Sequence, residues 1–98
     1  MDLNEIRQRI DQVDSEIILL LSQRAKLVSA AGQLKKDEQG VRDPKRVEQV
    51  IGKVRAKAAS SGFSPDIAER VYRTIIECFI DKELLEFNEL IETQEKEV

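Results

Sequence analysis

Apolar and small residues recur every three or four positions along the first third of the chain. They are Ile6, Ile10, Val13, Ile17, Leu20, Leu27 and Ala31. This spacing places them on one face of a helix and predicts a single long helix from about Leu3 to Lys36. A second stripe of Leu21, Ala25 and Val28 widens the apolar arc, so the middle of this helix is apolar over much of its circumference.

Prolines and glycines divide the rest of the chain. The polar segment Asp37–Arg42 contains Gly40 and predicts a loop. Asp43 and Pro44 then supply an N-cap and a first-turn proline, so we expect a second helix that ends at Ser60-Ser61-Gly62. The apolar face of this helix consists of Val47, Val50, Ile51 and Val54.

The same start signal, Ser64-Pro65-Asp66, opens a third predicted helix with an apolar stripe from Tyr72 to about Ile91. The polar residues 92–98 are expected to fray. The sequence contains no strand-like alternation and no internal repeat. The pattern therefore predicts an all-α fold with three helices in a single domain, residues 1–98.

The length of the first predicted helix has a consequence for assembly. A helix of this length extends about 50 Å at about 1.5 Å per residue. A compact domain of this size has a radius of gyration near 13 Å and a diameter of about 30 to 35 Å. The helix would project from its own domain with an apolar surface that needs a cover. We therefore expect an interlocked helical homodimer.

Composition excludes several classes of protein. The 98 residues are 41% hydrophobic and 36% charged, which is too apolar for a disordered segment and too charged for a membrane protein. The longest apolar run, Ile17–Leu21, is far shorter than the roughly 20 residues that span a bilayer. A net charge of −3 argues against a nucleic-acid partner, and the acidic start Met1–Glu5 does not resemble a signal peptide.

Two absences restrict the chemistry further. The chain has no histidine, which excludes a Ser-His-Asp triad, a Cys-His pair and any His-ligated metal site. The single Cys78 forms neither an internal disulfide nor a cysteine-rich metal cluster, and it fits a cytoplasmic setting. We expect no metal and no cofactor, and an enzyme of this composition would act through positioning and electrostatics.

Three charged residues occupy positions where the pattern calls for apolar ones. Arg24 and Lys35 continue the stripe of the first helix and, eleven residues apart, point within about 20° of each other. Two cations on a core-facing stripe are costly unless an anion neutralises them. Glu83 interrupts the stripe of the third helix in the same way. These three residues form either a structural salt bridge or one wall of a polar cavity.

Two further arginines are candidate site residues. Arg7 precedes Arg24 by seventeen residues, about 25 Å along the helix, so it cannot reach the same pocket within one chain. In an antiparallel or crossed pairing of two first helices, the partner's Arg7 could reach that pocket. Arg46 lies one turn into the second helix beside its apolar face, where a solvated surface role is the simplest interpretation.

Five segments together resemble the all-helical chorismate mutases. They are Leu3–Asp14, Leu19–Arg24, Gly32–Lys35, Val41–Arg46 and Ile75–Glu77. The resemblance covers residues 3 to about 90, and the ordered set of cations is its most specific part. It implies an interlocked dimer with two equivalent sites, each of which receives one arginine from the neighbouring subunit.

The resemblance also implies roles for individual residues. Arg7 matches the arginine donated across the dimer to a substrate carboxylate, and Arg24 matches the arginine that binds a carboxylate within the chain. Lys35 matches the lysine that hydrogen-bonds the breaking ether oxygen. Arg46 matches an arginine near the carboxylates, and Asp43 matches a residue that helps to seat the ring hydroxyl.

The chain departs from the family pattern at three positions. Val47 replaces the glutamate that usually follows the second-helix arginine, and Phe79 replaces a small hydroxyl residue. Glu83 replaces the glutamine that contacts the ether oxygen, as in some mutases of this family. An ionised Glu83 would repel the negative charge that grows on that oxygen, whereas a protonated Glu83 would donate a hydrogen bond to it.

The implied reaction is the Claisen rearrangement of chorismate, a small dianion, to prephenate. This pericyclic step needs no nucleophile, metal, cofactor or proton transfer, which suits a chain without histidine. The site must hold the dianion in a reactive conformation and stabilise charge on the ether oxygen. Each arginine–carboxylate contact is worth roughly 1.5–3 kcal/mol.

Three other functions stay open. An isochorismate-pyruvate lyase shares the fold and its cations, and Val47 and Phe79 resemble that branch. A mutase acting on an amino-substituted chorismate is a second alternative, in which Asp43 or Glu83 would face the amine. The third is a non-catalytic helical dimerisation module in which Arg24, Lys35 and Glu83 form a buried salt-bridge network.

Overall fold

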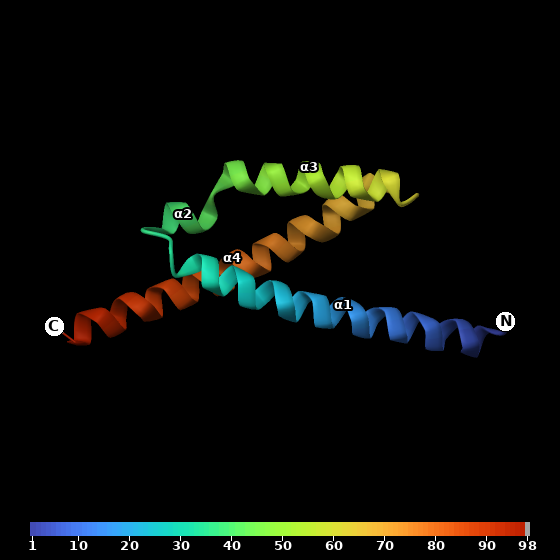
Figure 1. Ribbon diagram of the computed structural model, residues 1–98, viewed down its shortest axis with the longest axis horizontal. Coiled ribbons are helices and arrows are strands. Elements are labelled where there is room, and N and C mark those ends of the chain that lie inside the picture. Colours follow the sequence, from blue (N-terminus) through green and yellow to red (C-terminus); the bar gives the residue numbers. More distant parts are fainter. Residues whose placement is uncertain (98) are drawn as a thin grey trace.

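The computed structural model describes residues 1–97, and all of its regular elements are helices (Figure 1). They are α1 (Leu3–Gly32), α2 (Glu38–Arg42), α3 (Pro44–Ser60) and α4 (Pro65–Glu97). The expected all-α fold is confirmed for the described residues. The three long helices are the predicted ones, and α2 is an additional short helix.

The segment between the first two predicted helices differs from expectation. Helix α1 ends at Gly32 instead of Lys36, because the chain tightens into a turn in which the Lys35 amide donates to the Gly32 carbonyl oxygen at 3.1 Å. The predicted loop at Asp37–Arg42 is wrong, since residues 38–42 form α2. Asp37 caps this helix by accepting from the Gly40 amide at 2.8 Å, and the Val41 side chain anchors it in the core at 3% exposure.

The starts of α3 and α4 are confirmed in detail. The Asp43 carboxylate accepts a hydrogen bond from the Arg46 amide at 3.2 Å, and Pro44 occupies the first turn of α3. The Ser64 hydroxyl accepts from the Ile67 amide at 3.2 Å and starts α4 in the same way. Asp43 is both the C-cap of α2 and the N-cap of α3, and its φ of 30° lies in the left-handed region of backbone conformation. Aspartate is one of the few residues other than glycine that tolerate this region.

Helix α4 continues as helix through the polar segment that was expected to fray, as far as Glu97, and Val98 lies outside the described residues. Although α1 and α4 are both long, neither has a stretch apolar enough to cross a lipid bilayer.

The described chain is elongated, with extents of 63 × 27 × 15 Å and a radius of gyration of 17.3 Å. A compact domain of this length would have a radius near 13 Å. The N-terminal part of α1 and the C-terminal part of α4 account for the difference, because they project at opposite ends of the molecule (Figure 1) and residues 1–20 and 88–95 are all exposed. Five of the exposed apolar side chains on the N-terminal part of α1 share one helix face, and we name them the α1 stripe: Ile6, Ile10, Val13, Ile17 and Leu20. The predicted projecting apolar helix is therefore present.

The core lies mainly between α3 and α4, where Ile51 and Ala58 pack against Ala68 and Ile76. An ion-pair network crosses the same interface on its solvent side. Its members are Glu48, Arg55, Asp66, Glu69 and Arg73.

Glu69 is the centre of this network. Its carboxylate accepts from Arg73 at 2.8 Å and from Arg55 at 3.0 Å. Hydrogen bonds from Arg73 and then Arg55 outweigh a partial loss of solvation and lower the pKa of Glu69 below its usual range. A carboxylate whose pKa is lowered on folding stabilises the fold above its unfolded pKa, and this contribution is lost as the pH falls through the folded pKa.

We expect Glu69→Gln to lower the urea midpoint modestly at pH 7, because the network is exposed and screened by water. The difference from the unsubstituted protein should shrink as the pH falls below about 4. Glu92→Gln, an exposed α4 substitution outside the network, is the matched control and should change little at either pH. An equal loss of stability by Glu69→Gln at pH 7 and pH 3 would contradict this assignment.

Candidate active site

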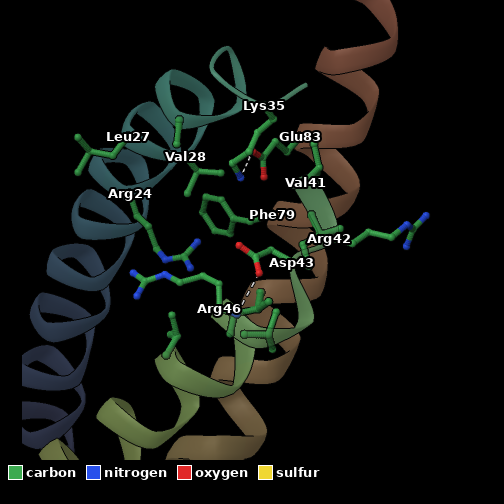
Figure 2. Close-up of a pocket in the computed structure, with 15 residues that line it drawn as sticks. Arg24, Leu27, Val28, Lys35, Val41, Arg42, Asp43, Arg46, Phe79 and Glu83 are labelled. Atoms are coloured by element: carbon green, nitrogen blue, oxygen red, sulfur yellow. Dashed lines mark hydrogen bonds and ion pairs between the residues drawn. The ribbon is translucent and has the colours of Figure 1, made fainter. Parts of the chain in front are cut away.

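A pocket of about 310 Å³ lies where the C-terminal part of α1, the α2 helix, the start of α3 and the middle of α4 converge (Figure 2). This volume is at the lower end of the range for small-molecule sites. Seven of the sequence-predicted site residues line it: Arg24, Lys35, Asp43, Arg46, Val47, Phe79 and Glu83.

Arg24 is held in the pocket by an aromatic contact. Its guanidinium carbon lies 4.6 Å from the centroid of the Phe79 ring. Its Nη1 atom is buried and has no hydrogen-bond partner among the described residues. A buried donor without a partner costs about 1–3 kcal/mol, and more when it is charged. The pocket therefore holds a half-buried guanidinium with one buried donor that an acceptor would stabilise.

Arg46 supplies a second cation from the first turn of α3. Figure 2 shows the guanidinium groups of Arg24 and Arg46 turned toward each other across the pocket. Within residues 1–97, no salt bridge joins either group to a carboxylate. Two like charges at close quarters repel each other, so an anion placed between them would be attracted by both.

Lys35 and Glu83 form an ion pair in the upper wall of the pocket in Figure 2. The Lys35 Nζ atom donates to Glu83 Oε1 at 3.2 Å. The Glu83 side chain is only 6% exposed, whereas that of Lys35 is 29% exposed. For Lys35 and Glu83 both interpretations therefore hold at once, because their salt bridge is also a wall of the cavity. Arg24 takes no part in that salt bridge within the described residues. Lys35 reaches this position although α1 ends before it.

Asp43, Val47 and Phe79 also line the pocket. Asp43, held at the α2–α3 junction, lies at one side with its carboxylate directed into the pocket (Figure 2). Val47 and Phe79 give the pocket an apolar surface in place of the usual polar side chains. In such surroundings hydrogen bonds and ion pairs to a ligand are stronger than in water.

Arg7 is the one predicted site residue that does not line the pocket. It lies in the exposed N-terminal part of α1, and the continuous helix separates it from Arg24 by about 25 Å. Its contribution to a partner's pocket remains a prediction.

Sequence reasoning did not place several other lining residues. Arg42 lies at the rim, and its guanidinium points away from the centre (Figure 2). Val28, Val41 and Ile80 belong to the apolar lining. Val41 was assigned to a loop, although an apolar residue in a polar segment was a signal for burial.

The charges around the pocket favour an anionic ligand. Arg24, Lys35, Arg42 and Arg46 outnumber Asp43 and Glu83, which leaves an excess of two positive charges. Within the described part of the chain, no group of three or more cysteine, aspartate or glutamate residues is placed to hold a metal ion. The donors of this site suit the binding of carboxylates and the stabilisation of a negative oxygen.

Comparison with known proteins agrees with this chemistry. The profile of the family described as chorismate mutase type II matches residues 6–84. A chorismate mutase of Methanocaldococcus jannaschii is 27% identical over 96 residues, which cover 96% of this chain and 93% of that protein. An isochorismate pyruvate lyase of Pseudomonas aeruginosa is 28% identical over 82 residues, or 84% of this chain and 81% of that protein.

A bifunctional chorismate mutase/prephenate dehydratase of Aquifex aeolicus is 34% identical over 86 residues. The match includes 84% of this chain but only 24% of that protein, so the chain spans about a quarter of this relative's length.

Proposed function

Because the chain belongs to the chorismate mutase type II family, we propose that it catalyses the cofactor-free rearrangement of chorismate to prephenate. The observation that carries the proposal is the buried, unpartnered Nη1 of Arg24, which faces a second free guanidinium in a pocket of suitable size. Chorismate has two carboxylates, and each matches the planar donor fork of an arginine.

Lys35 is the residue we assign to the ether oxygen. An ammonium group has three donors, and Lys35 gives one of them to Glu83. The others are available to stabilise negative charge as the carbon–oxygen bond breaks. By analogy with the loss of an oxyanion-hole donor, this contact accounts for about 3–4 kcal/mol of barrier lowering.

Glu83 contributes in a way that depends on its protonation. The ionised form balances Lys35 and opposes charge growth on the ether oxygen, whereas the protonated form donates a hydrogen bond to that oxygen. Asp43 is assigned to the ring hydroxyl, and Val47 and Phe79 to apolar faces of the substrate.

A second copy of the chain completes the site in this proposal. The α1 stripe is exposed, with Ile10 at 51% and Leu20 at 61%, and a second α1 would bury it. A crossed pairing of two α1 helices also carries the partner's Arg7 toward the pocket. We therefore propose an interlocked homodimer with two shared sites.

An isochorismate-pyruvate lyase is the second candidate function. It is supported by the Pseudomonas aeruginosa relative and by the apolar wall of Val47 and Phe79. Incubation with chorismate, isochorismate and aminodeoxychorismate in separate reactions distinguishes the candidates. Prephenate from chorismate supports the mutase, and pyruvate with salicylate from isochorismate supports the lyase. Turnover of none of the three supports a non-catalytic dimerisation module.

Removing the unpartnered cation is the first test of the mechanism. We expect Arg24→Ala to lower kcat/KM for chorismate by at least about 10²–10³-fold, since a buried donor to the dianion is lost. Lys26→Ala, which removes an exposed cation outside the pocket, should retain activity. Sedimentation should show both variants in the same oligomeric state as the unsubstituted protein. Full activity of Arg24→Ala would refute its assigned role.

Mixing two inactive variants tests whether the site is shared. Arg7→Ala and Arg24→Ala subunits, unfolded together and refolded at equal ratio, form heterodimers in half of the cases. Each heterodimer has one site that contains both arginines, so we expect roughly a quarter of the unsubstituted activity to return. Activity no higher than that of either variant alone would show that Arg7 and Arg24 do not meet across a dimer.

Substitution of Glu83 by an amide tests its assignment. Glu83→Gln has nearly the same shape, donates a hydrogen bond and carries no negative charge, so we expect it to raise kcat for chorismate at pH 7. A kcat of Glu83→Gln below that of the unsubstituted protein would contradict the repulsion assigned to the ionised carboxylate.

A further inference from the structure

Gly32, the last residue of α1, lies directly against the side chain of Glu83. A Cβ atom built at position 32 would be 2.9 Å from Glu83 Cγ, 2.9 Å from Oε1 and 3.3 Å from Cδ. Carbon atoms in van der Waals contact lie at about 3.5–4.0 Å, so a side chain at this position requires Glu83 to move.

Glu83 has little room to move. Its side chain is 6% exposed, and the close contacts include Cγ as well as the terminal oxygen. The oxygen that a Cβ would strike, Oε1, is the atom that accepts from Lys35 Nζ at 3.2 Å. The Gly32 carbonyl oxygen in turn accepts from the Lys35 amide at 3.1 Å. Gly32 therefore contacts both members of the Lys35–Glu83 pair.

The need for glycine here is steric and does not arise from the backbone conformation. The positive-φ glycine of the described chain is Gly62, with φ of 72°, and Gly32 has an ordinary helical conformation. Glycine is a poorer helix former than alanine, so its presence within α1 needs another reason. The close approach of Glu83 supplies that reason.

We propose that Gly32 is a positioning residue of the active site: by leaving space for the Glu83 carboxyl group, it fixes where the Lys35 amine points. This inference rests on the proposed function for its effect on turnover, although the contact itself is independent of it. Gly32 touches no substrate in this account and acts through Glu83 alone.

The direct test is Gly32→Ala, with Gly52→Ala as its matched control. Gly52 is also helical, but a Cβ there meets nothing within 4 Å. We expect Gly32→Ala to lower kcat by about 10²-fold, the cost of displacing a catalytic group by about 1 Å. KM should change little, because the arginines that bind the carboxylates are untouched. Gly52→Ala should match the unsubstituted protein in both constants, and an equal kcat for the two variants would overturn the proposal.

A double-mutant cycle shows whether Gly32 acts through Glu83. Glu83→Ala removes Cγ, Cδ and Oε1, which are the atoms that a Cβ at position 32 would strike. Adding Gly32→Ala to Glu83→Ala should therefore change kcat by no more than about twofold. If Gly32→Ala costs as much in this background as in the unsubstituted protein, Gly32 does not act through Glu83. Should Gly32→Ala alone fail to fold, the double variant is expected to fold, and its failure would also refute the proposal.

A measurement that does not depend on turnover tests the role of Gly32 independently of the proposed function. In carbon-13 NMR of the glutamate side chains, Gly32→Ala should move the Glu83 carboxyl signal, whereas Gly52→Ala should leave it unchanged. If the protein turns over none of the three substrates, the proposed function fails and the NMR comparison still decides the role of Gly32. An unchanged Glu83 signal in Gly32→Ala would overturn the inference.

Discussion

Two guanidinium groups, those of half-buried Arg24 and exposed Arg46, line a largely apolar pocket, and no carboxylate among the described side chains pairs with either. A buried and unsatisfied cation is costly, and a protein tolerates it where a ligand provides the missing acceptor. The ring of Phe79 compensates in part, since the guanidinium carbon of Arg24 lies over it at 4.6 Å from the centroid. In the proposed function, the dianionic substrate supplies the missing negative charge.

The long helix α1 links that pocket to the assembly of the protein. The part of α1 that carries Arg24 packs against α4, whereas the part that carries Arg7 and the α1 stripe extends into solvent. An apolar surface of this kind on an isolated chain calls for a partner. A second copy of the chain would bury the stripe and bring a further arginine to the site. The same contact between two α1 helices would then stabilise the dimer and complete the pocket.

The sequence predicted seven of the residues that line the pocket, but not the structure of the segment between α1 and α3. The starts of α3 and α4 followed from Asp43-Pro44 and Ser64-Pro65, since capping depends on residues close in sequence. The end of α1 and the α2 helix were missed because they depend on the burial of Val41 and on the approach of α4. The contact between Gly32 and Glu83 was not predictable for the same reason, since it joins two helices distant in sequence. Lys35 was placed in the pocket correctly, although it lies in a turn and not in the predicted helix.

Nitrogen-15 NMR of the arginine side chains during a titration with chorismate measures the central interaction most directly. The account predicts that the guanidinium signals of Arg24 and Arg46 shift together and saturate. The signal of Arg55, which is already paired with Asp66 and Glu69, should stay in place. Unchanged signals of Arg24 and Arg46 at saturating chorismate would show that the pocket does not bind the dianion, and would contradict the account.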